Sequence, residues 1–196
     1  MASTIDAMTR LQPGPARKLI LPNGVFGVLL FVLMEIMMFA GLISAFVIVR
    51  SNAVLWPPPG QPRLPVEETA ANTAALLTSG ILLLIANRRF ARKGDGVQSA
   101  LLASLVFGGV FLVAQGAEWV AMLGQGLTLT SSTHGSFFYL IVGAHGLHVL
   151  GGLVSLGFVS LWQHKKTLTH DQLWAISLFW YFCVLLWPVL YYRVYV

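Results

Sequence analysis

Charged residues are scarce in this chain of 196 residues, where Asp, Glu, Lys and Arg together make up only 10% of the sequence. A soluble globular domain carries about 25%. Hydrophobic residues account for 57% of the chain, so too few charges remain to cover a water-exposed surface. The composition therefore excludes an ordinary soluble domain and favours a handful of membrane spans.

Cysteine and the common catalytic signatures are also missing. The single cysteine, Cys183, lies in an apolar run and has no second cysteine with which to form an intrachain disulfide. The sequence contains no CxxC, no GxGxxG, no phosphate-binding loop and no HExxH. We therefore expect no metal site and no redox cofactor held by this chain.

A cleavable signal peptide is not expected, because residues 1–20 contain charges and three helix breakers instead of an apolar core. What the chain does have is five long apolar runs, at 24–49, 69–87, 99–123, 136–162 and 173–192. A bilayer core needs about 20 apolar residues in a helix, and lipid offers no partner for free backbone groups. We predict an all-α bundle of five transmembrane helices at 24–196, preceded by a cytoplasmic segment at 1–23.

The basic residues are distributed unequally between the two sides of the predicted bundle. Nine lie on the side of the N-terminus and three on the opposite side: Arg10, Arg17, Lys18, Arg88, Arg89, Arg92, Lys93, Lys165 and Lys166 against Arg50, Arg63 and Arg193. The positive-inside rule then places the N-terminus in the cytoplasm and the C-terminus outside. The formal net charge of +5 indicates topology and contact with anionic lipid, and no nucleic-acid partner is expected.

Ionisable side chains inside a span need a partner, a neutralising proton or a function, since each costs about 2.5–3.5 kcal/mol on insertion scales. Glu35 lies well inside the first span, with no basic residue within a turn or two. Two interpretations stay open. Glu35 either makes one interhelical hydrogen bond as a structural group, or it takes part in proton supply or in organising a lipid site.

The other intramembrane polar residues form stripes on two helices. Gln115 and Glu118 share one face of the third span, which we expect to face protein. His145 and His148 share a face of the fourth span, and Gly152 and Ser155 continue it with small residues that let another helix approach. A hydrogen-bonded polar seam, one that could include Glu118, is favoured over a haem or metal site, because bis-histidine haem needs imidazoles from opposing helices.

Several segments, taken in order, resemble subunit III of haem–copper oxidases over residues 24–192. They are the carboxylate-bearing helix at 34–41, the Trp-Pro-Pro loop at 56–58, Asn-Thr at 72–73, Gln-Gly-Ala-Glu-Trp at 115–119, and Gly-Ser-Phe-Phe at 135–138 leading to Gly-Ala-His-Gly-Leu-His-Val at 143–149. The last helix departs from the family pattern, because Tyr181 and Val184 stand where many relatives have His and Asp.

The resemblance implies the compact five-helix form of an accessory subunit of a proton-pumping terminal oxidase in a bacterial cytoplasmic membrane. Such a subunit binds no haem or copper, packs against catalytic subunit I and subunit II, holds phospholipid and sustains proton uptake. The parent enzyme passes electrons from cytochrome c or quinol to oxygen. Three alternatives remain: an accessory subunit of a nitric oxide reductase, a stand-alone transporter, and a haem b electron carrier.

Overall fold

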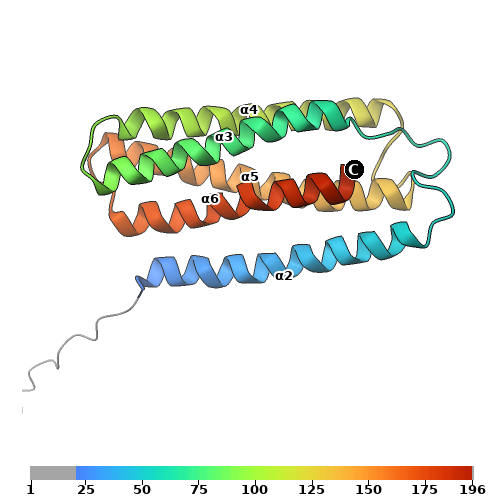
Figure 1. The fold of residues 1–196 in the computed structure, drawn as a ribbon, viewed down its shortest axis with the longest axis horizontal. Coiled ribbons are helices and arrows are strands. Elements are labelled where there is room, and N and C mark those ends of the chain that lie inside the picture. Colours follow the sequence, from blue (N-terminus) through green and yellow to red (C-terminus); the bar gives the residue numbers. More distant parts are fainter. Residues whose placement is uncertain (1–20, 196) are drawn as a thin grey trace, which may run out of the picture.

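The computed structural model describes residues 21–195, and those residues form a bundle of long helices without any strand. The helices are α2 (Asn23–Ser51), α3 (Val66–Ala91), α4 (Val97–Gly124), α5 (Thr133–His164) and α6 (His170–Leu190), and the π-helix η1 (Tyr191–Tyr195) continues α6 (Figure 1). Arg10, Arg17 and Lys18 of the predicted cytoplasmic segment lie outside the described residues.

Five helices in this part of the chain are long and apolar enough to cross a membrane, which confirms the predicted all-α bundle of five spans. The helices extend beyond the apolar runs because polar residues cap them. Ser132 accepts a hydrogen bond from Gly135 N at the start of α5. Thr169 and Gln172 form a capping box at the start of α6. The additional turns belong to the interfacial ends of the spans.

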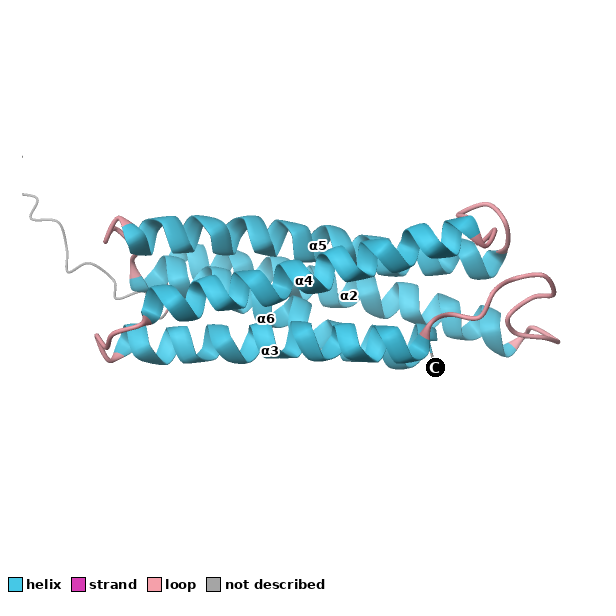
Figure 2. Ribbon diagram, turned by 90° about the horizontal axis from the view of Figure 1, so that it is seen from above, coloured by secondary structure: helices cyan, strands magenta, loops and turns pink. Residues whose placement is uncertain are grey.

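Neighbouring helices run antiparallel and are joined by short turns, except for the longer connection between α2 and α3 (Figures 1 and 2). Helices α3 and α4 pack closely against each other, and α5 and α6 complete a four-helix body. Helix α2 lies along the outside of this body and contacts chiefly α6, with a smaller contact to α5.

Helix α2 touches the rest of the bundle through a single stripe of side chains. Its buried residues are Val25, Val32, Phe39 and Phe46, spaced seven residues apart. A seven-residue repeat is the packing period of a helix in a left-handed helix pair. The remaining surface of α2 is apolar and largely exposed, so this helix is the most loosely attached of the five.

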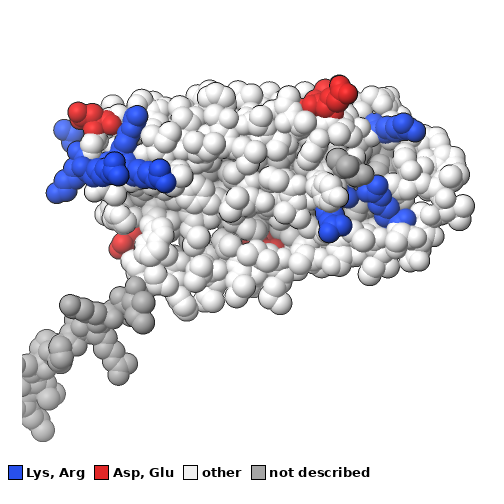
Figure 3. Space-filling model, viewed as in Figure 1, with Lys and Arg blue, Asp and Glu red and all other residues white. Residues whose placement is uncertain are grey.

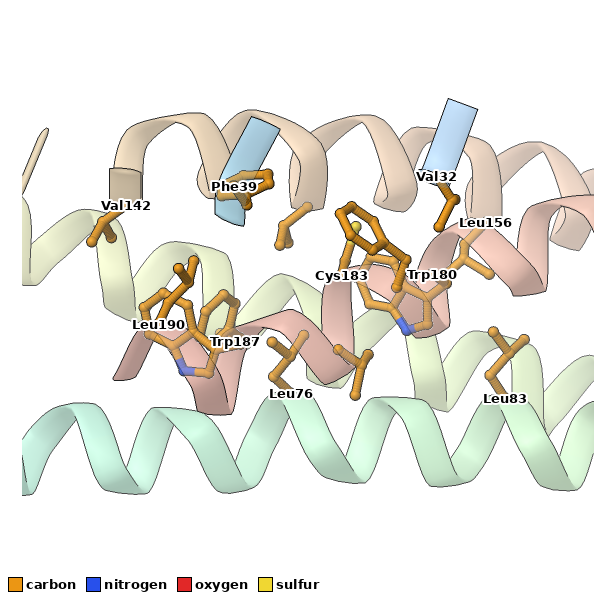
Figure 4. Close-up of a cluster of buried hydrophobic side chains, with 14 of the residues drawn as sticks. Val32, Phe39, Leu76, Leu83, Val142, Leu156, Trp180, Cys183, Trp187 and Leu190 are labelled. Atoms are coloured by element: carbon orange, nitrogen blue, oxygen red, sulfur yellow. The ribbon is translucent and has the colours of Figure 1, made fainter. Parts of the chain in front are cut away.

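The centre of the four-helix body is filled by two tryptophans of α6, Trp180 and Trp187, both fully buried (Figure 4). The Trp180 ring lies between two glycines. A Cβ atom at Gly152 of α5 would lie 2.6 Å from Trp180 Cε3, and one at Gly108 of α4 would lie 2.8 Å from Cζ2. The two glycines therefore create the slot that admits the indole.

Lysine and arginine side chains gather at the two ends of the bundle and leave its middle free of basic residues (Figure 3). One end carries Arg88, Arg89, Arg92 and Lys93 at the turn between α3 and α4, and the other carries Arg50, Arg63 and Arg193. This distribution suits a membrane-spanning bundle with charges at both interfaces. The cytoplasmic location of the first end stays a prediction.

Candidate functional site

The intramembrane carboxyl of α2 meets a histidine of α5. Glu35 Oε2 lies 2.9 Å from His148 Nε2, and both side chains are largely buried, at 14% and 16% exposure. Glu35 and His148 lie near the middle of their helices. The pair therefore sits at mid-membrane depth, and it supplies Glu35 with the basic partner that its own helix lacks.

The imidazole of His148 also contacts an oxygen of its own helix. His148 Nδ1 lies 2.7 Å from Ala144 O. A carbonyl oxygen can only accept, so Nδ1 carries the hydrogen of this contact. The approach of Nε2 to Glu35 Oε2 at 2.9 Å is a close electrostatic contact without hydrogen-bond geometry, since Oε2 has no hydrogen-bond partner among residues 21–195.

Aromatic rings of α2 and α6 lie around the imidazole of this pair. The ring centroids of Phe31 and Phe39 from α2 lie 6.5 Å and 5.4 Å from that of His148. Those of Phe179 and Phe182 from α6 lie 6.2 Å and 6.3 Å away. The rings keep competing polar groups away, which strengthens the electrostatic attraction between the two side chains.

The second intramembrane carboxyl, Glu118, is partly buried and is the acceptor of a hydrogen-bond cluster between α3 and α4. Asn72 Nδ2 donates to Glu118 Oε1 at 2.5 Å. Gln115 Nε2 donates to Glu118 Oε2 at 2.8 Å and to the Tyr195 hydroxyl at 3.0 Å. Thr69 Oγ1 lies 2.9 Å from Glu118 Oε2. The cluster ties α3, α4 and η1 together near one end of the bundle.

His145 and His148 face different parts of the bundle despite their spacing of three residues. His145 is fully buried and stacks on Trp187 of α6, with ring centroids 4.9 Å apart, and its edge-to-face partner is Phe111 of α4. Neither ring nitrogen of His145 has a hydrogen-bond partner within residues 21–195. The histidines thus do not join Glu118 in one hydrogen-bonded seam, because α3 and α4 supply the partners of that carboxyl.

The two small residues on the same face of α5, Gly152 and Ser155, also contact different parts of the bundle. Gly152 holds the Trp180 ring, as described above. The Ser155 hydroxyl donates to Gly151 O within its own helix at 2.8 Å, and it lines a shallow cavity with Val28 and Phe31 of α2. Of the polar residues singled out on α5, His148 is therefore the one whose side chain closely approaches a polar group of another helix.

Two positions at which α6 departs from the family pattern have local explanations. The Tyr181 hydroxyl accepts a hydrogen bond from Asn87 Nδ2 of α3 at 3.0 Å. Val184 packs against Gly80 of α3, where an added Cβ would lie 2.9 Å from Val184 Cγ1. Position 181 thus keeps a polar partner, whereas position 184 contributes to apolar packing.

Several interhelical contacts were missed by the sequence analysis. The Trp187 indole donates from Nε1 to Thr73 Oγ1 at 2.8 Å, and Ser79 bonds to Ser104 between α3 and α4. The polar residues that recur along α3 could have indicated that this helix forms hydrogen bonds with more than one neighbouring helix. No group of three or more His, Cys, Asp or Glu side chains converges within residues 21–195 in a way that could hold a metal ion.

Five membrane-length helices with two partly buried carboxyl groups within them define a polytopic helical membrane protein. Comparison with known proteins then specifies which kind. The family described as cytochrome c oxidase subunit III matches residues 16–196. This chain belongs to the cytochrome c oxidase subunit III family, and it is accordingly a multi-pass membrane subunit of an oxidase complex.

Individual relatives from distant organisms are all cytochrome c oxidase subunit 3 proteins. Cytochrome c oxidase subunit 3 of Corynebacterium diphtheriae is 30% identical, over 100% of this chain and 98% of that protein. The Synechocystis subunit 3 is 32% identical over 87% of this chain and 74% of its own length. The Mus musculus protein is 31% identical, over 87% of this chain but only 68% of its own length. In length this chain therefore matches the Corynebacterium relative.

Proposed function

We propose that this chain is the non-redox accessory subunit of a haem–copper terminal oxidase of the cytochrome c oxidase type. It stabilises the catalytic subunit, subunit I, holds phospholipid and supports proton uptake, while haem and copper reside in the partner. The family match over nearly the entire chain carries this proposal. The nitric oxide reductase alternative shares the compact bundle, and the transporter and haem b alternatives predict a chain that works without an oxidase partner.

The arrangement of the histidines supports the assignment of the metals to a partner. His145 is enclosed by the rings of Trp187 and Phe111, which occupy both the stacking face and the edge of its imidazole. His148 is engaged by Glu35 and by Ala144 O. An axial haem ligand needs a ring nitrogen that opens toward the iron, with room for the macrocycle beside it. His145 is buried among packed side chains, and both ring nitrogens of His148 lie next to an oxygen atom.

Isolation from the native membrane in mild detergent tests the proposal directly. We expect stoichiometric co-purification with a large subunit that contains haem and copper. Non-haem iron in place of copper would favour the nitric oxide reductase. A colourless chain that emerges alone would contradict the proposal and make transport the leading hypothesis.

The pair of Glu35 and His148 is the group that we propose for the role in proton movement. Glu35→Gln keeps the shape of the side chain but removes the group that can hold a proton. We expect Glu35→Gln and His148→Gln to leave the subunit in the complex and to slow turnover-linked proton uptake to a similar extent. The double variant should be no slower than either single variant, because both changes remove the same pair.

Loss of the subunit from the complex in Glu35→Gln would indicate a structural role for the pair. Met37→Gln is a matched control, since Met37 lies on the same helix with a 70% exposed side chain, away from the pair. Proton uptake at the wild-type rate in an assembled Glu35→Gln complex would contradict the proton role.

We also propose the bacterial cytoplasmic membrane as the location, with the N-terminus cytoplasmic and the C-terminus outside. Site-specific labelling tests this orientation, because the native Cys183 is buried and gives little background. Gln125→Cys and Lys93→Cys place thiols at exposed positions on opposite ends of the bundle. An impermeant thiol reagent added to intact cells should label the first and spare the second, and the reverse pattern would invert the topology.

A further inference from the structure

Two layers of side chains fill the centre of the four-helix body, and each contains one buried tryptophan of α6 (Figure 4). The first layer is the slot of Trp180, whose ring lies against Gly108 of α4 and Gly152 of α5. Seven residues make close to two helical turns, so a position seven residues further along a helix points in nearly the same direction. Helices α4 and α6 run one way and α5 runs the other. The next layer therefore lies seven residues later on α4 and α6, and seven residues earlier on α5.

This second layer consists of Gln115 of α4, His145 of α5 and Trp187 of α6, and their contacts agree with that register. The ring of His145 stacks on that of Trp187, with centroids 4.9 Å apart. Gln115 Nε2 donates to the Tyr195 hydroxyl at 3.0 Å, and the Tyr195 ring lies 6.1 Å from the Trp187 ring. Trp187 Nε1 donates to Thr73 Oγ1 of α3 at 2.8 Å. All four helices thus contribute a side chain with polar atoms to one layer.

Two members of this layer have polar atoms without a hydrogen-bond partner among residues 21–195. The atoms are Gln115 Oε1 and both ring nitrogens of His145. Gln115 is 3% exposed and His145 is 1% exposed, so neither side chain reaches solvent outside the bundle. The orientation of the Gln115 amide is fixed, because its Nε2 donates to the Glu118 carboxyl at 2.8 Å. Buried polar atoms in folded proteins bond to protein or to ordered water, so this layer needs a further partner.

Water is the ligand whose chemistry fits these atoms. A neutral imidazole has one N–H donor and one acceptor nitrogen, whereas the amide oxygen of Gln115 can only accept. One water molecule can accept from the N–H of His145 and donate to Gln115 Oε1 at the same time. Burial of both side chains leaves no route for a larger ligand. A metal ion does not suit the layer either, since within residues 21–195 no three His, Cys, Asp or Glu side chains converge.

We propose that the layer of Gln115, His145 and Trp187 binds an internal water molecule, which bridges a ring nitrogen of His145 and Gln115 Oε1. The water joins His145 to the cluster of Glu118, because the same amide donates to that carboxyl. A hydrogen-bonded chain then extends from a partly exposed carboxyl into the fully buried centre of the four-helix body. This site belongs to the core of the chain itself and does not depend on the proposed oxidase function.

A structure of the intact complex, determined by electron cryomicroscopy at a resolution that shows bound water, tests the site. We expect a density peak within about 2.7–3.2 Å of both a His145 ring nitrogen and Gln115 Oε1. A direct hydrogen bond between the two side chains would overturn the proposal. Absence of the peak, in a map that shows other buried waters, would also overturn it.

A substitution tests whether the water depends on the imidazole. His145→Phe keeps an aromatic ring against Trp187 but removes both nitrogens, so the peak should disappear. Ser104→Ala is the matched control, because Ser104 is also fully buried in the four-helix body but already bonds to Ser79 of α3. The control should leave the peak in place. A peak that persists in His145→Phe would contradict a site that includes the imidazole.

Solid-state NMR of the wild-type complex in lipid bilayers, with ¹⁵N-labelled histidine, is a second measurement. Magnetisation should pass from water protons to the ring N–H of His145, which is the signal missing from His145→Phe. His145→Gln provides the same assignment if the phenylalanine variant does not assemble. Absence of transfer to this N–H would overturn the bound water. If the chain purifies without a haem-containing partner, the proposed function fails, whereas both measurements can still be made on the chain alone.

Discussion

Substitution of Gly152 by alanine tests the central packing of the bundle most sharply. The added Cβ would lie 2.6 Å from Trp180 Cε3 and 2.9 Å from Cζ3, closer than carbon atoms approach in folded proteins. The ring has no room to move away, because on its other side it lies so close to Gly108 that even a Cβ added there would be 2.8 Å from Cζ2. The new methyl group must therefore push α5 and α6 apart or force the indole out of its preferred rotamer.

Overpacking of this kind costs about 1–3 kcal/mol. Alanine also has a higher helix propensity than glycine, by about 1 kcal/mol, which would offset part of the loss. Gly151→Ala is the matched control, since an added Cβ there meets nothing within 4 Å. The difference in unfolding free energy between the two variants cancels the propensity and should equal the overpacking cost alone, about 1–3 kcal/mol.

Reversible unfolding in mixed detergent micelles, followed by tryptophan fluorescence, measures this difference. Trp180→Phe supplies a further check, because a smaller ring leaves room for the Gly152→Ala methyl group. The combined variant should lose at least about 1 kcal/mol less than the sum of the two single losses, since the residues are in contact. Equal stability of Gly152→Ala and Gly151→Ala would refute the tight slot between the two glycines.

Three further substitutions probe the polar contacts by the same unfolding assay. Glu118→Ala removes the acceptor of three side chains and should lower stability by about 2 kcal/mol, at roughly 0.6 kcal/mol for each hydrogen bond in a membrane, whereas Glu118→Gln keeps one acceptor and should lose less. Tyr181→Phe should cost only about 0.6 kcal/mol, because Asn87 retains its bond to Ser177 Oγ at 3.0 Å. Ser132→Ala removes the N-cap of α5 and should cost about 1 kcal/mol. A Tyr181→Phe loss as large as that of Glu118→Ala would contradict this ranking.

The number and type of the helices could be predicted because the bilayer imposes a simple length and hydropathy rule. The first and last residues of the helices could not be predicted from hydropathy alone, since the helices continue beyond the apolar run into the polar interface. The start of α5 at Thr133, three residues before the predicted 136, depends on the capping hydroxyl of Ser132. Such caps are visible in the sequence, but only as local patterns that also occur in loops.

The partners of the intramembrane carboxyls could be predicted only in part. The shared face of Gln115 and Glu118 follows from helical periodicity, and the two side chains are indeed bonded. The pairing of Glu35 with His148 depends on which helices become neighbours and in what register, and a hydropathy pattern carries no such information. The inclusion of Glu118 in the predicted polar seam of the histidines was left open for the same reason, and in the structure Asn72 of α3 is one of the partners of that carboxyl.

Helix α2 is loosely attached, so the contact of Glu35 with His148 can serve both to attach this helix and to carry out a function. The fully buried residues of α2 come once in every two turns, with partly buried Val28, Leu42 and Ile43 beside them, so a polar pair adds to a narrow contact. An apolar cavity of about 330 Å³ lies next to this stripe, lined in part by Val32 and Ile36 of α2 and by Phe182 of α6. The close contact between Glu35 and His148 adds electrostatic attraction between α2 and α5 without burying more of the surface of α2.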